Sequence, residues 1–401
     1  MKRILLLGTI LVTLGLASIG CSSGGIADES GYIPPEETYS GEAIAPESAN
    51  FSASARAFVA GMGTGWNLGN TLDAHGVSGL AAETCWGQPT TTKAMMEGLY
   101  ASGIRTVRVP VSWHDHVNAA YTVDSAWMNR VREVVDYAID SGLYVIVNIH
   151  HDNDESFYFP DRRYRERSLA YVTRIWKQIA LEFRNYDEHL VFELLNEPRL
   201  VGYEKEWNWS DSDSALADAA ALIGEMEQAA LDAIRATGSN NADRFVMITP
   251  YVASPWAATS GRFVIPEDTA SDKLILSVHA YTPYSFAMED PGVSDFTIAH
   301  RNDIDYFMSQ LNAKFVVGMN MPVIIGEYGA TNKNNPSDRE EWFTYYVTKA
   351  KSYGMLTILW DNGNHSIPAS GSYEELYGFY DRSAGTWYFQ SILDAILAAL
   401  D

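Results

Sequence analysis

The feature that most constrains the fold of this chain is an alternation of short apolar runs with amphipathic helical stretches. Eight of the runs are continuously apolar, which is typical of strands that are buried on both faces of a parallel sheet. The predicted strands are Gly63–Asn67, Thr106–Val109, Tyr144–Asn148, Leu190–Leu195, Phe245–Thr249, Leu274–Val278, Val323–Gly326 and Leu356–Trp360.

Helical periodicity separates most of these runs. The predicted helices are Thr91–Ala101, Ala126–Asp140, Tyr171–Phe183, Ala215–Ala236, Ile304–Val317 and Glu340–Ser352, and glycine stop signals follow several of them. Only Val252–Asp272, between the fifth and sixth strands, has no clear helical pattern. Eight strand–helix units predict an α/β fold, a single (β/α)₈ TIM barrel. A doubly wound open sheet is the alternative, but no glycine-rich phosphate loop follows an early strand.

The N-terminal segment precedes this pattern and predicts export. A short basic start is followed by the apolar stretch Ile4–Leu16, which is too short for a comfortable membrane span, and small residues lead to Cys21. The sequence LASIGC resembles a bacterial lipoprotein box, which implies lipidation of Cys21 and anchoring at the outer membrane or cell surface. An ordinary secretory signal is the alternative. The expected divisions are a signal peptide (1–20), a disordered tether (21–50) and one folded domain (51–401).

Charge and cysteine content narrow the possible partners. The formal net charge is −23, and such a surface repels polyanions, which argues against nucleic acid as a ligand. After cleavage and lipidation only Cys85 would carry a free thiol, so no intramolecular disulfide is expected. Cys85 has no sequence neighbour that suggests metal or redox chemistry, and we predict a structural role for it.

Polar side chains follow the ends of the predicted strands, where barrel enzymes carry their functional groups. In strand order they are Asn67 and Asn70; Arg108; His150 and His151; Asn196 and Glu197; His279 and Tyr281; Glu327 and Tyr328; Trp360 and Asp361. So many polar groups on one rim are hard to explain by stability alone and indicate a functional site.

Two glutamates stand out in this set, because Glu197 and Glu327 end the fourth and seventh strands. Glycoside hydrolysis needs one carboxyl group that holds a proton and a second that stays charged. A nearby cation such as Arg108 would favour the ionised form of its neighbour. A third glutamate, Glu193, lies within the apolar run VFELLNEP and is interpreted as a buried structural carboxylate with an unidentified partner inside the barrel.

Taken together, the strand-end motifs resemble those of glycoside hydrolase family 5. They are VFELLNEP, IIGEYGA, TVRVPVSW, NIHHD, HAYTPYSF and ILWDNG, in order from about Phe51 to the C-terminus at barrel spacing. The opening GWNLGNTLDA, with CWGQP shortly after it, is similar to the subfamily of endo-β-1,4-glucanases and xyloglucanases that is often called subfamily 4.

The resemblance implies a role for each matching position. Glu197 would be the general acid/base and Glu327 the nucleophile of a retaining reaction, with the carboxyl groups about 5 Å apart. The other implied substrate or carboxylate contacts are Asn67, Asn196 at the sugar 2-hydroxyl, Arg108 and Tyr281 at the nucleophile, His279 near the acid/base, His150 and His151 at the sugar, and Trp360 as the stacking floor. The family needs no metal or organic cofactor.

Some residues leave two interpretations open. For His150 and His151 sugar contact is favoured over metal binding, because neighbours on a strand point to opposite faces. His75, His114 and His116, on predicted rim loops, are interpreted as solvated or secondary sugar contacts. Trp86, Trp113 and Tyr284 either line a cleft or pack in the core, whereas Trp66 and Trp176 are predicted to pack. Asp361 and Asn362 either define a subsite or stabilise their loop.

The sequence therefore predicts a surface-tethered, monomeric enzyme that cleaves neutral β-glucan, such as cellulose-type chains, mixed-linkage glucan or xyloglucan. A mannanase or xylanase on the same scaffold is one alternative. A surface protein that binds glycans without cutting them is another, although binding alone does not require the pair Glu197 and Glu327.

Overall fold

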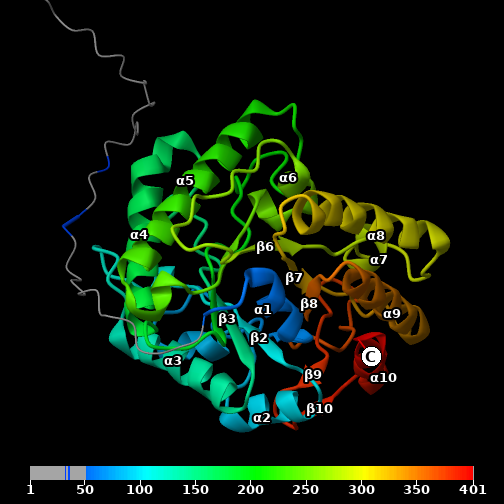
Figure 1. Cartoon of the computed structure of the whole chain (residues 1–401). Coiled ribbons are helices and arrows are strands. Elements are labelled where there is room, and N and C mark those ends of the chain that lie inside the picture. Colours follow the sequence, from blue (N-terminus) through cyan, green and yellow to red (C-terminus); the bar gives the residue numbers. More distant parts are fainter. Residues whose placement is uncertain (1–31, 33–34, 37–50, 401) are drawn as a thin grey trace, which may run out of the picture.

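The computed structural model describes residues 32, 35–36 and 51–400, and its centre is a closed barrel of eight parallel strands (Figure 1). The strands follow one another around the ring in sequence order, and pairing of Gly65 with Ile358 and of Trp66 with Leu359 closes it. They are β1 Gly65–Asn67, β2 Thr106–Val109, β3 Tyr144–Asn148, β4 Leu190–Glu193, β5 Val246–Ile248, β6 Leu274–His279, β7 Val323–Tyr328 and β8 Leu356–Leu359. The predicted TIM barrel is confirmed.

All eight predicted strands are present, but their ends differ where the functional residues lie. β4 ends at Glu193, two residues before the predicted end, whereas β6 and β7 continue to His279 and Tyr328. The register shifts between Val278 and His279 where β6 pairs with β7. Such irregularities redirect side chains near active sites, and here they lie directly beside two functional candidates.

The helices surround the barrel as an outer layer (Figure 1). The predicted helices appear as α2 Lys93–Ala101, α3 Ser125–Asp140, α4 Arg165–Glu182, α5 Ser214–Ala236, α8 Ile298–Leu311 with a π-helical extension Asn312–Val317, and α9 Pro336–Ser352. Asp124 and Asp213 cap α3 and α5 by accepting hydrogen bonds from backbone N–H groups of the first turn. The stretch Val252–Asp272 contains the end of a 3-10 turn (Tyr251–Ala253) and the short α6, Pro255–Thr259, in keeping with its weak helical pattern.

One helix that the sequence analysis did not predict covers the N-terminal end of the barrel. This helix, α1 (Ala55–Gly61), lies over the centre of the ring in Figure 1. The ring of Phe58 stacks on Phe245 with centroids 3.9 Å apart, and Lys273 Nζ donates to the Phe51 carbonyl at 2.5 Å. This contact layer also includes the inward side chains of five other strands, such as Ile146 and Ile324. The barrel is therefore sealed at this end.

The C-terminal part adds a two-stranded sheet and a last helix. β9 (Tyr380–Asp381) pairs antiparallel with β10 (Thr386–Trp387), and α10 (Gln390–Leu400) follows. A further short helix, α7 (Tyr284–Ala287), comes soon after β6. Among the described residues no helix is both long and apolar enough to cross a membrane.

Two described residues of the predicted tether, Tyr32 and Pro35, contact the folded domain. The Tyr32 hydroxyl donates to the Tyr121 hydroxyl at 3.0 Å, and the Arg167 guanidinium lies 4.8 Å from the centroid of the Tyr32 ring. Arg174 donates to the Pro35 carbonyl. At these positions the chain lies against the domain instead of extending away from it. Cys21 and the other residues of the tether lie outside the described residues.

Candidate active site

A single arginine joins the polar groups at the open end of the barrel. Arg108, on β2, is fully buried, and its guanidinium donates to Glu193 Oε2 at 2.7 Å and to Glu327 Oε1 at 2.8 Å. It also donates to Asn67 Oδ1 at 2.9 Å and to Asn196 Oδ1 at 2.7 Å. Burial opposes its positive charge, but the two glutamates raise the pKa of Arg108 overall. The arginine therefore stays charged and fixes four side chains.

Glu197 and Glu327 both approach the Nδ1 atom of His279, at 2.8 and 3.6 Å. Oxygens of the two carboxyl groups and a ring nitrogen of His279 lie within 4.8 Å of one another. His279 Nδ1 lies 2.8 Å from Glu197 Oε1, and the Tyr281 hydroxyl donates to Glu327 Oε2 at 2.9 Å. This separation matches a pair of carboxyl groups that acts directly on a sugar, rather than the wider pair that leaves room for a water between them.

The protonation of these groups is linked. Burial opposes the charge of His279, but Glu327 and Glu197 raise the pKa of this imidazole. Burial would raise the pKa of Glu197, yet the hydrogen bond with His279 holds that pKa below its ordinary value. Burial raises the pKa of Glu327, against the opposing charges of His279 and Arg108. These directions favour a proton on His279 Nδ1 and an ionised Glu197, so Glu197 can act as an acid only after this proton has passed to it.

The structure identifies the partners of Glu193. This fully buried carboxylate accepts hydrogen bonds from Arg108 Nε, from Ser277 Oγ at 2.6 Å and from Asn148 Nδ2 at 2.9 Å. Its expected structural role is confirmed, because it accepts hydrogen bonds from three donors inside the barrel. One of these donors is Arg108, which Glu193 thereby holds in position. Asn67 likewise lies inside the barrel, where its amide donates to the Gly326 carbonyl at 2.9 Å.

The two adjacent histidines lie beyond the end of β3. His150 Nδ1 lies 3.0 Å from Asn148 Nδ2, and its ring is parallel to Trp360 with centroids 6.0 Å apart. His151 lies beside it, with ring centroids 4.4 Å apart. Because β3 ends at Asn148, the rule that neighbours point to opposite faces does not apply, and both imidazoles reach one region together with Asp73. Burial keeps both neutral, lowering the pKa of His151 to about 3 and that of His150 well below its ordinary value.

The aromatic residues divide between core and rim. Trp113 is buried and donates to the Asn148 carbonyl at 3.0 Å, so it belongs to the core. Trp66 and Trp176 are also buried, as predicted. Trp86 and Tyr284 are 36% and 61% exposed and lie at the surface.

Asp361 has a structural role that resolves its two interpretations. Its Oδ2 accepts from the Trp66 indole N–H at 2.8 Å and from the backbone N–H groups of Phe379 and Tyr380 at 3.0 and 2.8 Å. Asn362 is fully buried and holds the same loop by donating to the Glu375 carbonyl at 2.9 Å. Neither side chain is left to define a subsite.

One aromatic residue near the acid/base candidate is absent from the residues predicted from the sequence. Trp207 is 57% exposed, and the Arg199 guanidinium lies 4.0 Å from the centroid of its ring. Arg199 also donates to the Glu197 carbonyl at 3.1 Å, so this aromatic surface is attached to the Glu197 loop. The signal was present as the aromatic-rich stretch EWNWS ten positions after Glu197.

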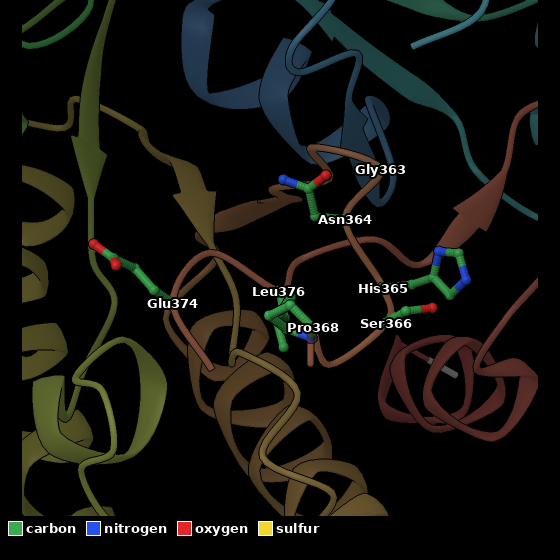
Figure 2. Close-up of a pocket in the computed structure, with 7 residues that line it drawn as sticks. All are labelled: Gly363, Asn364, His365, Ser366, Pro368, Glu374 and Leu376. Atoms are coloured by element: carbon green, nitrogen blue, oxygen red, sulfur yellow. The ribbon is translucent and has the colours of Figure 1, made fainter. Parts of the chain in front are cut away.

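A cavity of about 410 Å³ lies in the loop that follows β8 (Figure 2). The residues that line it come from two stretches of this loop: Gly363, Asn364, His365, Ser366, Pro368, Glu374 and Leu376. Its floor includes the apolar side chains of Pro368 and Leu376, whereas Asn364 and His365 are polar. None of these residues belongs to the carboxyl group cluster around Arg108.

Comparisons with known proteins agree with this geometry. The sequence model described as Cellulase (glycosyl hydrolase family 5) matches residues 71–366. Endoglucanase A of Ruminococcus albus is 40% identical over 86% of this chain and 92% of its own length.

Two solved structures have the same fold. A glycoside hydrolase 5 lichenase from Caldicellulosiruptor sp. F32, in complex with cellotetraose, is 37% identical with a TM-score of 0.83 and covers 91% of this chain and 100% of that one. A GH5-4 broad specificity endoglucanase from Ruminococcus champanellensis with bound cellotriose is 39% identical with a TM-score of 0.81, covering 88% and 100%. With the closed barrel, the paired carboxyl groups and these similarities, the chain belongs to glycoside hydrolase family 5.

Proposed function

We propose that this protein is an endo-acting β-1,4-glucanase that cleaves neutral β-glucan with retention of anomeric configuration. The observation that carries the proposal is the placement of Glu197 and Glu327 within 4.8 Å of a shared histidine, at the open end of the barrel. The named relatives are endoglucanases and a lichenase, and two of the solved structures hold cello-oligosaccharides.

In the first step Glu327 attacks the anomeric carbon while the leaving oxygen takes a proton. Arg108 and the Tyr281 hydroxyl bind the two oxygens of Glu327, which orients this carboxyl group and opposes the rise in its pKa that burial causes. Glu197 donates a proton that it receives from His279 to the leaving oxygen, and the glycosidic C–O bond breaks. The product is a glycosyl ester on Glu327 and a free chain end.

In the second step a water molecule hydrolyses this ester. Glu197, now ionised, takes a proton from the water, whose oxygen attacks the anomeric carbon and releases Glu327 as a carboxylate. Asn196, positioned by its hydrogen bond from Arg108, is placed to contact the 2-hydroxyl of the reacting sugar. Trp360 stacks on the sugar, and the neutral His150 and His151 offer uncharged hydrogen bonds to it.

A panel of soluble polysaccharides tests this proposal. Wild-type protein is expected to release reducing ends from barley glucan, carboxymethylcellulose or xyloglucan, and Glu327→Ala should bind these chains without cutting them. Proton NMR of the first products should show the β-anomer. Hydrolysis of mannan or xylan alone would favour a mannanase or xylanase. If no reducing ends were released from any glucan, mannan or xylan, the proposal that the protein is an enzyme would be rejected.

We also propose that Cys21 carries a lipid that anchors the monomeric protein at the cell surface. The support is the LASIGC sequence and the acid-rich segment that separates it from the barrel. Cys21→Ala should move the protein from the membrane fraction to the soluble fraction. An unchanged distribution would contradict the anchor, and a molecular mass above that of one chain in light scattering would contradict the monomer.

A further inference from the structure

A cluster of two histidines and one aspartate lies on the loops after β1 and β2. One ligand atom from each of His75, His114 and Asp115 lies within 4.8 Å of the others. His114 Nε2 is 3.7 Å from Asp115 Oδ2, and the rings of His75 and His114 have centroids 5.4 Å apart. The proposed hydrolysis assigns no task to these three side chains.

A buried carboxylate orients His114 toward this cluster. Asp152 Oδ1 lies 3.3 Å from His114 Nδ1, and it also accepts from the Tyr171 hydroxyl at 2.7 Å. Asp152 is fully buried, so its position is fixed. When Nδ1 donates its proton to this carboxylate, the lone pair of Nε2 faces Asp115. A histidine that is bound by a carboxylate on one nitrogen and offers the other is the arrangement found around protein-bound zinc.

The third ligand is held by the backbone. Asp115 Oδ2 accepts from the Gly76 N–H at 2.6 Å, which joins the two loops and places the carboxylate next to His75. His75 is exposed, so its ring can rotate to shorten the remaining distances. Ligand atoms of a tetrahedral zinc site are about 3.3 Å apart, so separations within 4.8 Å require a movement of at most about 1.5 Å.

The other two clusters of possible ligands are less suitable. In the first, Asp73 and His150 are buried, and His150 Nδ1 lies 3.0 Å from Asn148 Nδ2, so neither side chain can move toward an ion as the exposed His75 can. In the second, Glu197, His279 and Glu327 face the positive charge of Arg108, which repels a cation. In the described part of the chain, neither Asp115 nor the two histidines forms an ion pair with a lysine or arginine.

From this geometry we propose that His75, His114 and Asp115 bind a divalent transition-metal ion, with Zn²⁺ as the best match for two imidazoles and one carboxylate. Water would complete the coordination. The ion lies at the rim of the substrate cleft, because the ring of His75 is 4.9 Å from Trp86 and 5.4 Å from His151, measured between centroids. The proposed ligands of the ion do not include Glu197 or Glu327, which carry out the proposed hydrolysis.

Isothermal titration of the full-length protein with zinc chloride tests this site. Wild-type protein is expected to bind one ion per chain at this site, and His75→Ala should weaken binding at least tenfold. His75 is exposed, so its removal leaves the fold intact. His189→Ala is the matched control, since His189 pairs with Asp187 at 3.1 Å at the opposite end of the barrel, and it should not change the affinity.

Two further arms locate the ion. Co²⁺ in place of Zn²⁺ should give a visible absorption band that is lost in His75→Ala and retained in His189→Ala. Glu327→Gln should bind zinc as wild-type does, whether or not the protein hydrolyses glucan. Equal zinc affinity of wild-type and His75→Ala, or loss of zinc binding in Glu327→Gln, would overturn the proposal.

Discussion

At the scale of single residues, the substitution of glutamine for glutamate is expected to affect stability much more at Glu193 than at Glu197. Glu193→Gln removes the buried negative charge that faces Arg108 Nε at 2.7 Å and leaves an amide among three donors. Breaking a buried ion pair costs about 3–5 kcal/mol, so the free energy of unfolding should fall by about that amount.

The matched variant Glu197→Gln should abolish hydrolysis but lower the free energy of unfolding by less than about 1 kcal/mol, because Glu197 is partly exposed. Urea unfolding followed by tryptophan fluorescence measures both variants. If the two variants lost equal amounts of unfolding free energy, the structural role proposed for Glu193 would be contradicted.

His116 should make stability depend on pH. Its ring stacks on Trp127 with centroids 3.7 Å apart, both ring nitrogens are buried without a partner, and burial lowers its pKa to about 4. In the unfolded chain the pKa is near 6.5, so the unfolded state takes up a proton first as the pH falls. The stabilising effect of the neutral form is therefore present above pH 6.5 and is lost between pH 6.5 and 4.

The variant His116→Phe keeps a stacked ring and removes this titration. Between pH 7 and pH 5 wild-type protein should lose about 2 kcal/mol more stability than the variant. The difference between the two proteins excludes the contributions of the other histidines, including His151, to the pH dependence of stability. Parallel curves of unfolding free energy against pH would contradict the assignment.

At the scale of elements, the strands were predictable and the ends of the strands were less so. Continuous apolar runs identified all eight strands because each is buried on both faces, and the motifs identified the residues around Arg108. The register shift beside His279 depends on pairing with β7, which no local pattern encodes. Helix α1 was missed because it is only seven residues long and is stabilised by contacts with distant strands such as that of Phe245.

The environment of Glu193 shows the same division. Its burial was predicted from the apolar run, but its partners lie on β2, β3 and β6, far away in the sequence. The role of Asp361 could not be decided either, because the N–H groups that it binds belong to residues 379 and 380. Sequence patterns indicate that a polar group needs a partner, whereas the closed barrel decides which one it receives.

The loop after β1 depends on a glycine that supports Trp360. A Cβ atom on Gly69 would lie 2.8 Å from the Asp361 carbonyl and 2.8 Å from the indole ring of Trp360. Gly69→Ala should therefore displace the stacking ring and lower kcat/KM on cellotetraose about tenfold, which corresponds to about 1.4 kcal/mol.

Gly61→Ala is the control, because a Cβ atom on Gly61 would meet nothing within 4 Å. Both variants should fold with the same far-UV circular dichroism spectrum. Identical kcat/KM values for the two variants would show that Trp360 is not held in place through Gly69.

At the scale of the whole molecule, the two ends of the barrel have separate tasks. α1 seals one end through Phe58, whereas the carboxyl groups lie at the other end. Phe58→Ala removes a buried ring and should lower the free energy of unfolding by about 3–5 kcal/mol with kcat unchanged.

Ile298→Ala, at a side chain that is 75% exposed, should change neither quantity and serves as the control. Thermal unfolding and initial rates of glucan hydrolysis measure the two effects. A parallel loss of kcat and stability in Phe58→Ala would mean that the two ends are mechanically coupled.

The network around Arg108 also connects the catalytic centre to the assembly of the barrel. Its guanidinium on β2 binds groups from β1, from β4 and its following loop, and from β7, so the network is complete only when strands from both halves of the chain stand in the ring. The last pairing, β1 with β8, joins residues almost 300 positions apart. Enzymatic activity therefore reports closure of the ring during refolding, whereas helix content reports only the local steps that precede it.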